Sequence, residues 1–233
     1  MLLKGLIKGR LIRRYKRFLA DVEVNGKVIT AHCPNSGSMK SLKEPGSIVY
    51  VTKAENENRK LKYTLQLIET KNGIACVNTN LPNKIVFDAL YSNKIPELKF
   101  HKIQREVKYG EENSRVDILL FGKKKTFVEV KNVTLEEPEI PGVAQFPDAV
   151  TTRGQKHLRE LANEVKNGSD AIIFLLVNRT DCNRFKIAEH IDKDYKNEFD
   201  KAIKNGVRAL VYKSDIRIEG EDATITLGEK IKF

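Results

Sequence analysis

Two neighbouring apolar segments in the middle of the chain carry an aspartate, a glutamate and a lysine that could act together. Asp117 interrupts the first segment, and Glu129 and Lys131 lie in the second. Successive side chains of a β-strand alternate between its two faces, so Glu129 and Lys131 share one face. Asp117 is expected to point away from the apolar side chains of Val116 and Ile118. Two adjacent strands would then place the three polar side chains on one surface.

These side chains suit metal-assisted chemistry on a phosphate. Carboxylates are hard oxygen ligands for Mg²⁺ or Mn²⁺, and such a cation polarises a phosphate and lowers the pKa of a bound water. Lys131 could orient that water or neutralise developing negative charge. Glu106, on the preceding segment, is expected as a third carboxylate beside Asp117 and Glu129. The predicted cofactor is therefore Mg²⁺ or Mn²⁺.

The pattern resembles the Asp…Glu-x-Lys active site of the restriction-endonuclease-like nuclease superfamily. That resemblance implies that Asp117 and Glu129 bind metal and that Lys131 assists phosphodiester cleavage. A Glu-x-Lys triplet alone is common, and an exposed ion pair on a strand face is the alternative. An aspartate within an otherwise apolar strand favours the nuclease interpretation.

A predicted helix over residues 152–168 follows this site and carries further polar residues. Its apolar residues recur at helical spacing, a threonine can cap its start, and Gly168 ends it. Gln155, Lys156 and Arg159 lie in its first turns, where free backbone amides attract phosphate. Solvated charges on an ordinary capped helix are the alternative. His157 could shuttle a proton, although packing or surface exposure is the commoner role of a single helical histidine.

The first 20 residues hold seven basic side chains and no acidic one. Aromatic residues are interleaved with them, which suits a groove that pairs cations with phosphates and stacks rings on bases. Core packing of the aromatic residues beside merely solvated cations is the alternative. The predicted nucleic-acid-binding residues of this stretch are Arg13, Arg14, Tyr15, Lys16 and Arg17.

Composition agrees with a protein that binds a polyanion. Of the 233 residues, 40% are hydrophobic and 31% are charged, and the formal net charge is +11, which favours a nucleic acid, DNA or RNA, as the partner. Acidic lipid or a merely solvated basic face are the alternatives. The longest apolar run, residues 171–177, is far too short to cross a bilayer, and basic residues interrupt the apolar N-terminus. We therefore expect no membrane partner and a cytoplasmic location. The three cysteines are expected to be reduced thiols.

The segment His-Cys-Pro-Asn-Ser-Gly-Ser-Met, residues 32–39, contains several groups that could bind a ligand. It has no second histidine or cysteine at metal-ligand spacing, and neither Ser36 nor Ser38 has an evident activating base. A structural turn rich in hydrogen-bonding groups is the favoured interpretation. A loop that contacts phosphate is the alternative.

The elements that precede the site predict an all-β domain. Five short β-like runs are separated by turn residues, with a strong hairpin signal at Asn25 and Gly26. Such strands predict a small barrel of the oligonucleotide-binding (OB) type, with a plain β-sandwich as the alternative. The predicted runs cover residues 17–24, 27–32, 47–52, 61–69 and 73–77.

The second part of the chain predicts an α/β domain with a mixed sheet. A connecting helix near residues 84–91 marks the boundary, so the expected domains are residues 1–82 and 83–233. Strands then alternate with helices, and the continuously apolar run 171–177 is expected to be a central strand buried on both faces. The other predicted strands cover residues 103–109, 115–121, 126–133 and 207–212, and a second helix covers residues 192–206.

Several long motifs together resemble the sugar fermentation stimulation protein A family. They are RYKRFLADV, AHCPNSGSM, NRKL, SRVDILL, VEVKNVTL and FPDAVTTRGQKHLREL, which span nearly the whole chain, with Ser36 where a threonine is expected. The resemblance implies an N-terminal OB-like domain, a C-terminal restriction-endonuclease-like domain and DNA binding. It also implies that Asp117, Glu129 and Lys131 match the metal and catalytic positions of the nuclease superfamily.

Two classes of function follow from these observations. The first is a DNA-binding nuclease that cleaves phosphodiesters with a divalent metal. The second is a non-catalytic DNA-binding regulator of sugar-utilisation genes on a nuclease-like fold, which the family name favours. Binding of RNA or a nucleotide by the N-terminal barrel is a weaker third possibility.

Overall fold

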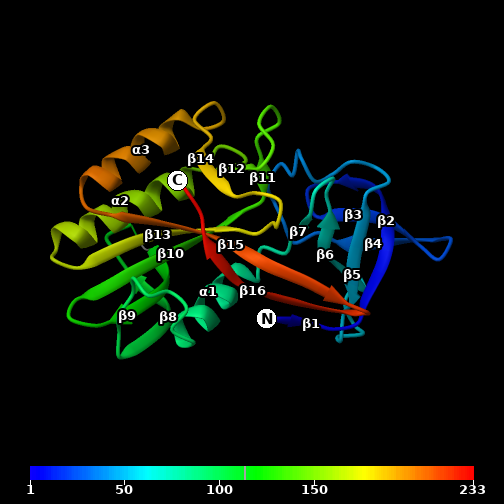
Figure 1. Cartoon of the computed structure of the whole chain (residues 1–233), viewed down its shortest axis with the longest axis horizontal. Coiled ribbons are helices and arrows are strands. Elements are labelled where there is room, and N and C mark those ends of the chain that lie inside the picture. Colours follow the sequence, from blue (N-terminus) through cyan, green and yellow to red (C-terminus); the bar gives the residue numbers. More distant parts are fainter. Residues whose placement is uncertain (113) are drawn as a thin grey trace.

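The computed structural model describes residues 1–112 and 114–233, and its N-terminal part forms a closed β-barrel (Figure 1). Five strands follow the order β4-β3-β2-β5-β6, and pairing of β4 with β6 closes the ring, as expected for a barrel and not for a sandwich. Strand β7 extends the sheet beyond β6. These strands are β2 (Leu6–Tyr15), β3 (Leu19–Val24), β4 (Lys27–His32), β5 (Ile48–Lys53), β6 (Tyr63–Glu69) and β7 (Ile74–Cys76).

Strand β2 was not among the five predicted runs. Basic side chains interrupt its apolar pattern, and only Leu6 and Leu11 of its ten residues are buried. The strand nevertheless lies in the middle of the barrel sheet, between β3 and β5. A Cβ added at Gly9 would lie 2.6 Å from the backbone oxygen of Glu23, so glycine lets β2 approach β3 closely.

The rest of the chain is built on a seven-stranded mixed sheet of order β1-β16-β15-β13-β10-β9-β8. Strand β13 runs parallel to β10 and β15, and the other neighbours are antiparallel. A smaller sheet has the order β11-β12-β14. The strands are β1 (Leu2–Leu3), β8 (Lys102–Tyr109), β9 (Ser114–Phe121), β10 (Lys125–Val133), β11 (Leu135–Glu136), β12 (Val143–Phe146), β13 (Asp170–Val177), β14 (Arg184–Ile187), β15 (Arg208–Glu219) and β16 (Asp222–Lys230).

Helices pack on both faces of the large sheet (Figure 1). Helix α1 (Pro82–Tyr91) covers one face, and α2 (Thr152–Lys166) and α3 (Lys193–Lys204) cover the other. Alternate residues of β13 belong to the two resulting cores, so this strand is buried on both faces as predicted. The strands of the sheet therefore carry side chains into an α1-side core and an α2-side core.

One end of the expected N-terminal domain belongs to the other sheet. Leu2 and Leu3 pair with Thr224 and Ala223 of β16, so β1 is an edge strand of the large sheet. Leu3 and Leu6 are also buried in the α1-side core. The apolar start of the chain therefore packs against the C-terminal domain before the chain enters the barrel.

The buried Arg179 and its partner Asp181 join the two domains through hydrogen bonds. The Arg179 side chain is 0% exposed and makes paired contacts of 2.6 and 2.8 Å with Asp181 and one of 2.6 Å with Glu136. Its Nη1 also donates to Ser41 of the barrel at 3.3 Å, and Thr70 of the barrel donates to Asp181 at 2.5 Å. These contacts fix the barrel against the loop after β13.

Across residues 1–112 and 114–233, every helix is too short or too polar to span a bilayer.

Candidate metal-dependent catalytic site

Asp117 lies where strands β9 and β10 separate. The two strands pair from Ile118 opposite Val128 to Phe121 opposite Lys125, and the pairing ends next to Asp117. Asp117 Oδ2 accepts a 2.7 Å hydrogen bond from the Val130 backbone amide, beyond the last strand pair. Its Oδ1 accepts a second 2.7 Å bond from Asn83 Nδ2 in the first turn of α1. Both carboxylate oxygens are therefore held at the fork between the strands.

The prediction that Val116 and Ile118 share a face differs from the structure. Val116 packs in the α2-side core, whereas Ile118 packs in the α1-side core. On β8, Ile103 packs against the α1-side core and Val107 packs against the α2-side core, with Glu106 between them. Both strands are therefore distorted at one level of the sheet, which brings the Asp117 carboxylate to the edge of β10.

Glu106 lies at this distortion, and its side chain is exposed. The strand pairs Arg105 with Ile118 and Val107 with Val116 leave Glu106 opposite Asp117, with a left-handed φ of +53° and an exposed side chain. Such a φ is uncommon in a residue other than glycine. Among the residues that the structure describes, no three His, Cys, Asp or Glu side chains are grouped as metal ligands. The geometry therefore gives no support for Glu106 as a third ligand.

Glu129 is the most deeply buried acidic group of the site, with 2% of its surface exposed. Its Oε1 accepts a 2.7 Å hydrogen bond from Lys131 Nζ and also contacts His157 Nδ1. Lys131 Nζ lies 3.3 Å from the same His157 nitrogen. Glu129 Oε2 is buried and has no hydrogen-bond partner within the described part of the chain. One oxygen of Glu129 is thus fully used, and the other is available.

The two carboxylates influence each other's ionisation. Burial, followed by the negative charge of Glu129, raises the pKa of Asp117 to about 6. Burial also acts to raise the pKa of Glu129, but Lys131 and His157 outweigh it and hold that pKa below its ordinary value. Glu129 therefore loses its proton first, and Asp117 ionises only near pH 6, although Val130, Lys131 and Asn83 partly offset the cost of its charge.

These properties fit a divalent cation. A buried carboxylate oxygen without a partner is costly unless something binds it, and a cation beside it would also stabilise the charge of Asp117. Oxygen donors from Asp117 and Glu129 match the preference of Mg²⁺ or Mn²⁺ for hard ligands. Asp117 and Glu129 would hold such a cation, whereas the Glu106 side chain is exposed.

His157, for which packing or surface exposure is the favoured interpretation from the sequence and a proton shuttle the alternative, is a buried neighbour of Glu129. It is buried in α2, one residue before Leu158 in the α2-side core, and is 4% exposed. Its Nδ1 faces Glu129, and its Nε2 lies 3.4 Å from Arg153 Nε. No sequence signal identifies Glu129 as its partner.

The other predicted residues of α2 are occupied by contacts within the protein. Gln155 Nε2 lies 3.1 Å from Asp192, and Asp192 also accepts from the Thr151 amide at 2.8 Å. Lys156 donates to the Glu112 carbonyl, and Arg159 forms an exposed 3.5 Å ion pair with Glu112. A carboxylate already lies at this helix start, which disfavours a phosphate there.

The predicted basic stretch divides into residues held by the barrel and residues that project from it. Arg13 pairs with Asp21 at 2.8 Å and lies over the Tyr15 ring, and Tyr15 itself donates to Asp21. Arg14 Nη2 donates to the carbonyls of residues 35 and 37 at 2.7 and 2.9 Å. Lys16 and Arg17 form the exposed turn between β2 and β3, both with positive φ.

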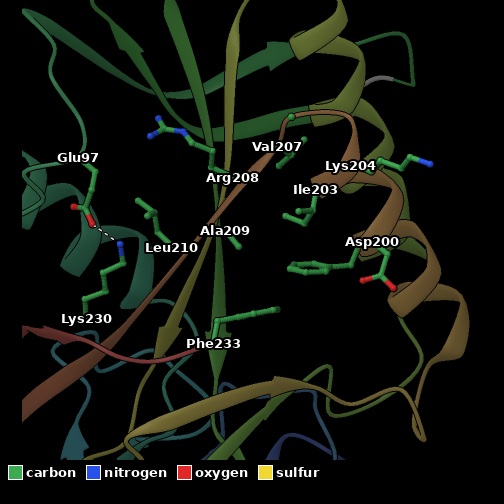
Figure 2. A pocket seen from close by; sticks show the side chains of 12 residues that line it. Glu97, Asp200, Ile203, Lys204, Val207, Arg208, Ala209, Leu210, Lys230 and Phe233 are labelled. Atoms are coloured by element: carbon green, nitrogen blue, oxygen red, sulfur yellow. Dashed lines mark hydrogen bonds and ion pairs between the residues drawn. The ribbon is translucent and has the colours of Figure 1, made fainter.

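Two hollows differ in their relation to this site. A polar cleft of about 560 Å³ between the barrel and the C-terminal domain is lined in part by Asn132, which follows Lys131 on β10. A larger, more apolar hollow of about 820 Å³ lies beside α3, where Ile203 and Phe233 surround it in Figure 2. None of the predicted site residues lines the larger hollow, so size alone does not locate the site.

Comparisons with known proteins cover both domains. The sugar fermentation stimulation protein RE domain matches residues 80–220, and the SfsA N-terminal OB domain matches residues 12–77. The sugar fermentation stimulation protein homolog of Pelagibacter ubique is 46% identical over 232 residues, which cover 99% of this chain and 97% of that protein. The homolog of Geobacter metallireducens is 49% identical over 212 residues, 90% of each protein.

A solved structure agrees with these matches. The structure of Pyrococcus furiosus SfsA in complex with Ca²⁺ has a TM-score of 0.87 and 27% identity, and the match covers 100% of this chain and 97% of that one. The predicted OB-like barrel and restriction-endonuclease-like domain are thereby confirmed. Since both domains match and relatives near half identity extend over almost the whole chain, the chain belongs to the sugar fermentation stimulation protein (SfsA) family.

Proposed function

We propose that this protein cleaves DNA phosphodiesters with a divalent cation bound by Asp117 and Glu129. The observation that carries the proposal is the unpartnered, buried Oε2 of Glu129 beside an Asp117 whose pKa is raised to about 6 by burial and by Glu129. A divalent cation stabilises two such carboxylates better than water does. The Ca²⁺ in the similar Pyrococcus furiosus structure supports a divalent metal as the ligand class.

Different residues of the chain have different roles in the proposed reaction. Val130 and Asn83 hold both oxygens of Asp117, so its carboxylate is fixed before substrate arrives. Lys131, held 2.7 Å from Glu129, keeps a positive charge where negative charge develops on the phosphate. When bound, the cation polarises the phosphate and lowers the pKa of an attacking water.

The DNA-binding part of the proposal rests on charge and on the barrel. The net charge of +11 attracts a polyanion. Lys16 and Arg17 project from the barrel, and Arg17 lines the polar cleft that Asn132 also lines. Arg13, Arg14 and Tyr15 support this surface through their contacts with Asp21 and the neighbouring loop.

The test is cleavage of labelled single-stranded and duplex DNA in Mg²⁺, Mn²⁺ or chelator. Lys131→Ala should bind DNA like the parent but cut at least about 100-fold more slowly, because its charge acts in the transition state. Asp117→Asn and Glu129→Gln should also lose cleavage. Lys125→Ala, an exposed lysine at the start of β10, is the matched control and should cut normally.

Two results would contradict the proposal. Equal cutting by the parent and all three site variants would locate the activity elsewhere. A parent that binds DNA but cuts nothing with any metal would support the non-catalytic regulator instead.

A further inference from the structure

The polar cleft between the two domains has the chemistry of a nucleic-acid site. Its walls are the barrel loop of residues 35–38, the end of β10 and residues 146–151. Arg14 and Arg17 are its cations and Asp148 is its one carboxylate among the residues that the structure describes. Hydroxyl and amide groups supply most of the remaining polar surface, from Asn35, Ser36, Ser38, Thr79, Asn132, Thr134 and Thr151. Such a surface offers many hydrogen bonds to phosphate and sugar oxygens and little that would repel them.

Specific contacts fix the loop that forms one wall of the cleft. Arg14 ties the loop to β2 through the carbonyls of residues 35 and 37, and Thr79 donates to the Pro34 carbonyl at 2.5 Å. The loop also packs closely against the C-terminal domain, because a Cβ added at Gly37 would lie 1.9 Å from Asp148 Oδ2 and would require that side chain to move. The loop and its facing wall are therefore in close contact.

Two buried polar atoms in the walls have no partner of their own. Arg14 Nε and the Ser38 hydroxyl make no hydrogen bond to any described residue. Buried polar groups are nearly always paired, with protein, water or ligand. Both residues line the same cleft, so a bound polar molecule or its water shell is the natural partner.

An exposed aromatic platform lies next to the cleft. The Phe18 ring is 48% exposed and stacks on His32, with ring centroids 6.5 Å apart. Phe18 follows Arg17, and its carbonyl accepts from the Cys33 amide at 2.8 Å, which places the platform at the base of the loop. Burial lowers the pKa of His32, followed by the charge of Arg59, so at neutral pH the stack is two uncharged rings. Such rings stack with unpaired bases.

The cleft also lies at the end of β10, the strand that carries the proposed catalytic Lys131. Asn132 lines it, and the preceding residue on β10 is Lys131. Thr151 lines it as well and caps the start of α2, the helix that carries His157. A strand in the cleft would therefore lie at the ends of β10 and α2, the two elements that carry Lys131 and His157.

We propose that this cleft binds single-stranded DNA, with the backbone in the cleft and a base on Phe18. This inference rests on the proposed function and adds its substrate class. In a duplex the bases are already stacked and paired, so they reach an aromatic platform only after unpairing. A single strand exposes both its bases and its backbone and satisfies the platform and the cleft together.

The experiment compares binding of a labelled oligothymidylate and of a duplex of equal length by fluorescence anisotropy, in chelator and with Asp117→Asn protein so that nothing is cut. Phe18→Ala should weaken single-strand binding about 5- to 100-fold, the range for loss of base stacking, and leave duplex binding unchanged. Tyr91→Ala, another exposed aromatic at the end of α1, is its control.

Ser36→Glu tests the cleft itself by adding a negative charge to its rim. It should weaken single-strand binding, whereas Ser92→Glu, at an exposed site beyond α1, should not. If the parent binds duplex and single-stranded DNA equally well, and neither Phe18→Ala nor Ser36→Glu changes the single-strand affinity, this inference is overturned while DNA binding itself stands. A parent that binds neither DNA would overturn both proposals, and tighter binding of oligouridylate would overturn the assignment to DNA.

Discussion

Glu129 and His157 meet inside the C-terminal domain, although 28 residues separate them in the chain. His157 Nδ1 and Lys131 Nζ contact the same Glu129 oxygen and lie 3.3 Å from each other. Helix α2 thereby fixes the orientation of a carboxylate on β10 and leaves its second oxygen available. We interpret His157 as a positioning residue that supports both the glutamate and the lysine.

Loss of His157 should therefore impair the site without removing a ligand. His157→Ala should weaken Mn²⁺ binding and slow cleavage by about 10- to 100-fold, the usual effect of removing a group that orients a metal ligand. His157→Asn, whose amide can take the place of Nδ1, should recover part of both.

The exposed His190 supplies a matched control, since His190→Ala should change neither quantity. Calorimetry measures metal affinity, and single-turnover cleavage measures the rate. A His157→Ala protein with normal metal affinity and normal cleavage would show that the histidine is only a core residue.

Asp117→Asn should make the metal-free protein more stable at pH 7. Burial, then Glu129, raises the pKa of Asp117 to about 6, so its stabilising contribution is lost as pH rises from about 4 through about 6. A neutral amide avoids that cost, and Asn83 can turn its oxygen toward the new donor. We expect a gain of about 1 kcal/mol, or a melting temperature higher by about 2–4 °C.

The same substitution should remove the stabilisation that Mn²⁺ gives the parent, because metal binds preferentially to the folded site. Thermal melts with Mn²⁺ and with chelator measure both effects. Asp88→Asn, at an exposed ion pair on α1, is the control. Metal-free Asp117→Asn melting well below the parent would refute the proposed repulsion between the carboxylates.

Arg17 should contribute more to DNA affinity than Arg13 or Arg14. Arg13 is paired with Asp21, and Arg14 is bound to two carbonyls, whereas Arg17 lies on the exposed turn. Arg17→Ala should lower the slope of log affinity against log salt by about one unit, and Arg13→Ala by less. Arg217→Ala, an exposed arginine on β15, should leave the slope unchanged. Equal slopes for the Arg17→Ala and parent proteins would remove the β2–β3 turn from the binding surface.

The contact between Arg179 and Asp181 should make the joint between the domains sensitive to acid. Burial alone would raise the pKa of Asp181, but hydrogen bonds from Arg179 and Thr70 and the charge of Arg179 lower it. A lowered pKa stabilises the folded protein above about pH 4, and this contribution is lost as pH falls through the folded pKa.

Asp181→Asn should therefore cost about 3 kcal/mol near pH 7, and the difference from the parent should shrink below about pH 4. Urea denaturation between pH 3 and pH 7 measures the difference in the free energy of unfolding between the two proteins. Asp215→Asn breaks an exposed pair with Arg217 and should cost little. A constant difference at every pH would mean that the charge of Asp181 is not the source of its effect.

Local pattern predicts much of this fold. Asn25 and Gly26 both have positive φ between β3 and β4, as the hairpin signal requires. Asp192 caps α3 by accepting from the Tyr195 amide at 2.9 Å, and Thr151 caps α2. These features depend on a few neighbouring residues, so periodicity and capping rules identify them.

The features that the pattern missed depend on distant contacts. Strand β2 is accommodated by its two neighbours despite its charges, and β15 continues to Glu219, beyond the predicted end at residue 212, because β16 pairs with it. At the site, alternation along β10 predicts that Glu129 and Lys131 lie together. The partnership with His157 and the turned-out Glu106 follow from how α2 and β8 pack, which one sequence does not encode locally.

The measurement that tests the central claim most directly is calorimetric titration of Mn²⁺ into the parent, Asp117→Asn and Glu129→Gln proteins. If the two carboxylates share one cation, the parent should bind one equivalent, and each variant should lose most of that affinity. Glu106→Gln should keep it, because that side chain is turned to solvent. Parent-like Mn²⁺ affinity in both Asp117→Asn and Glu129→Gln would contradict the assignment of the metal site.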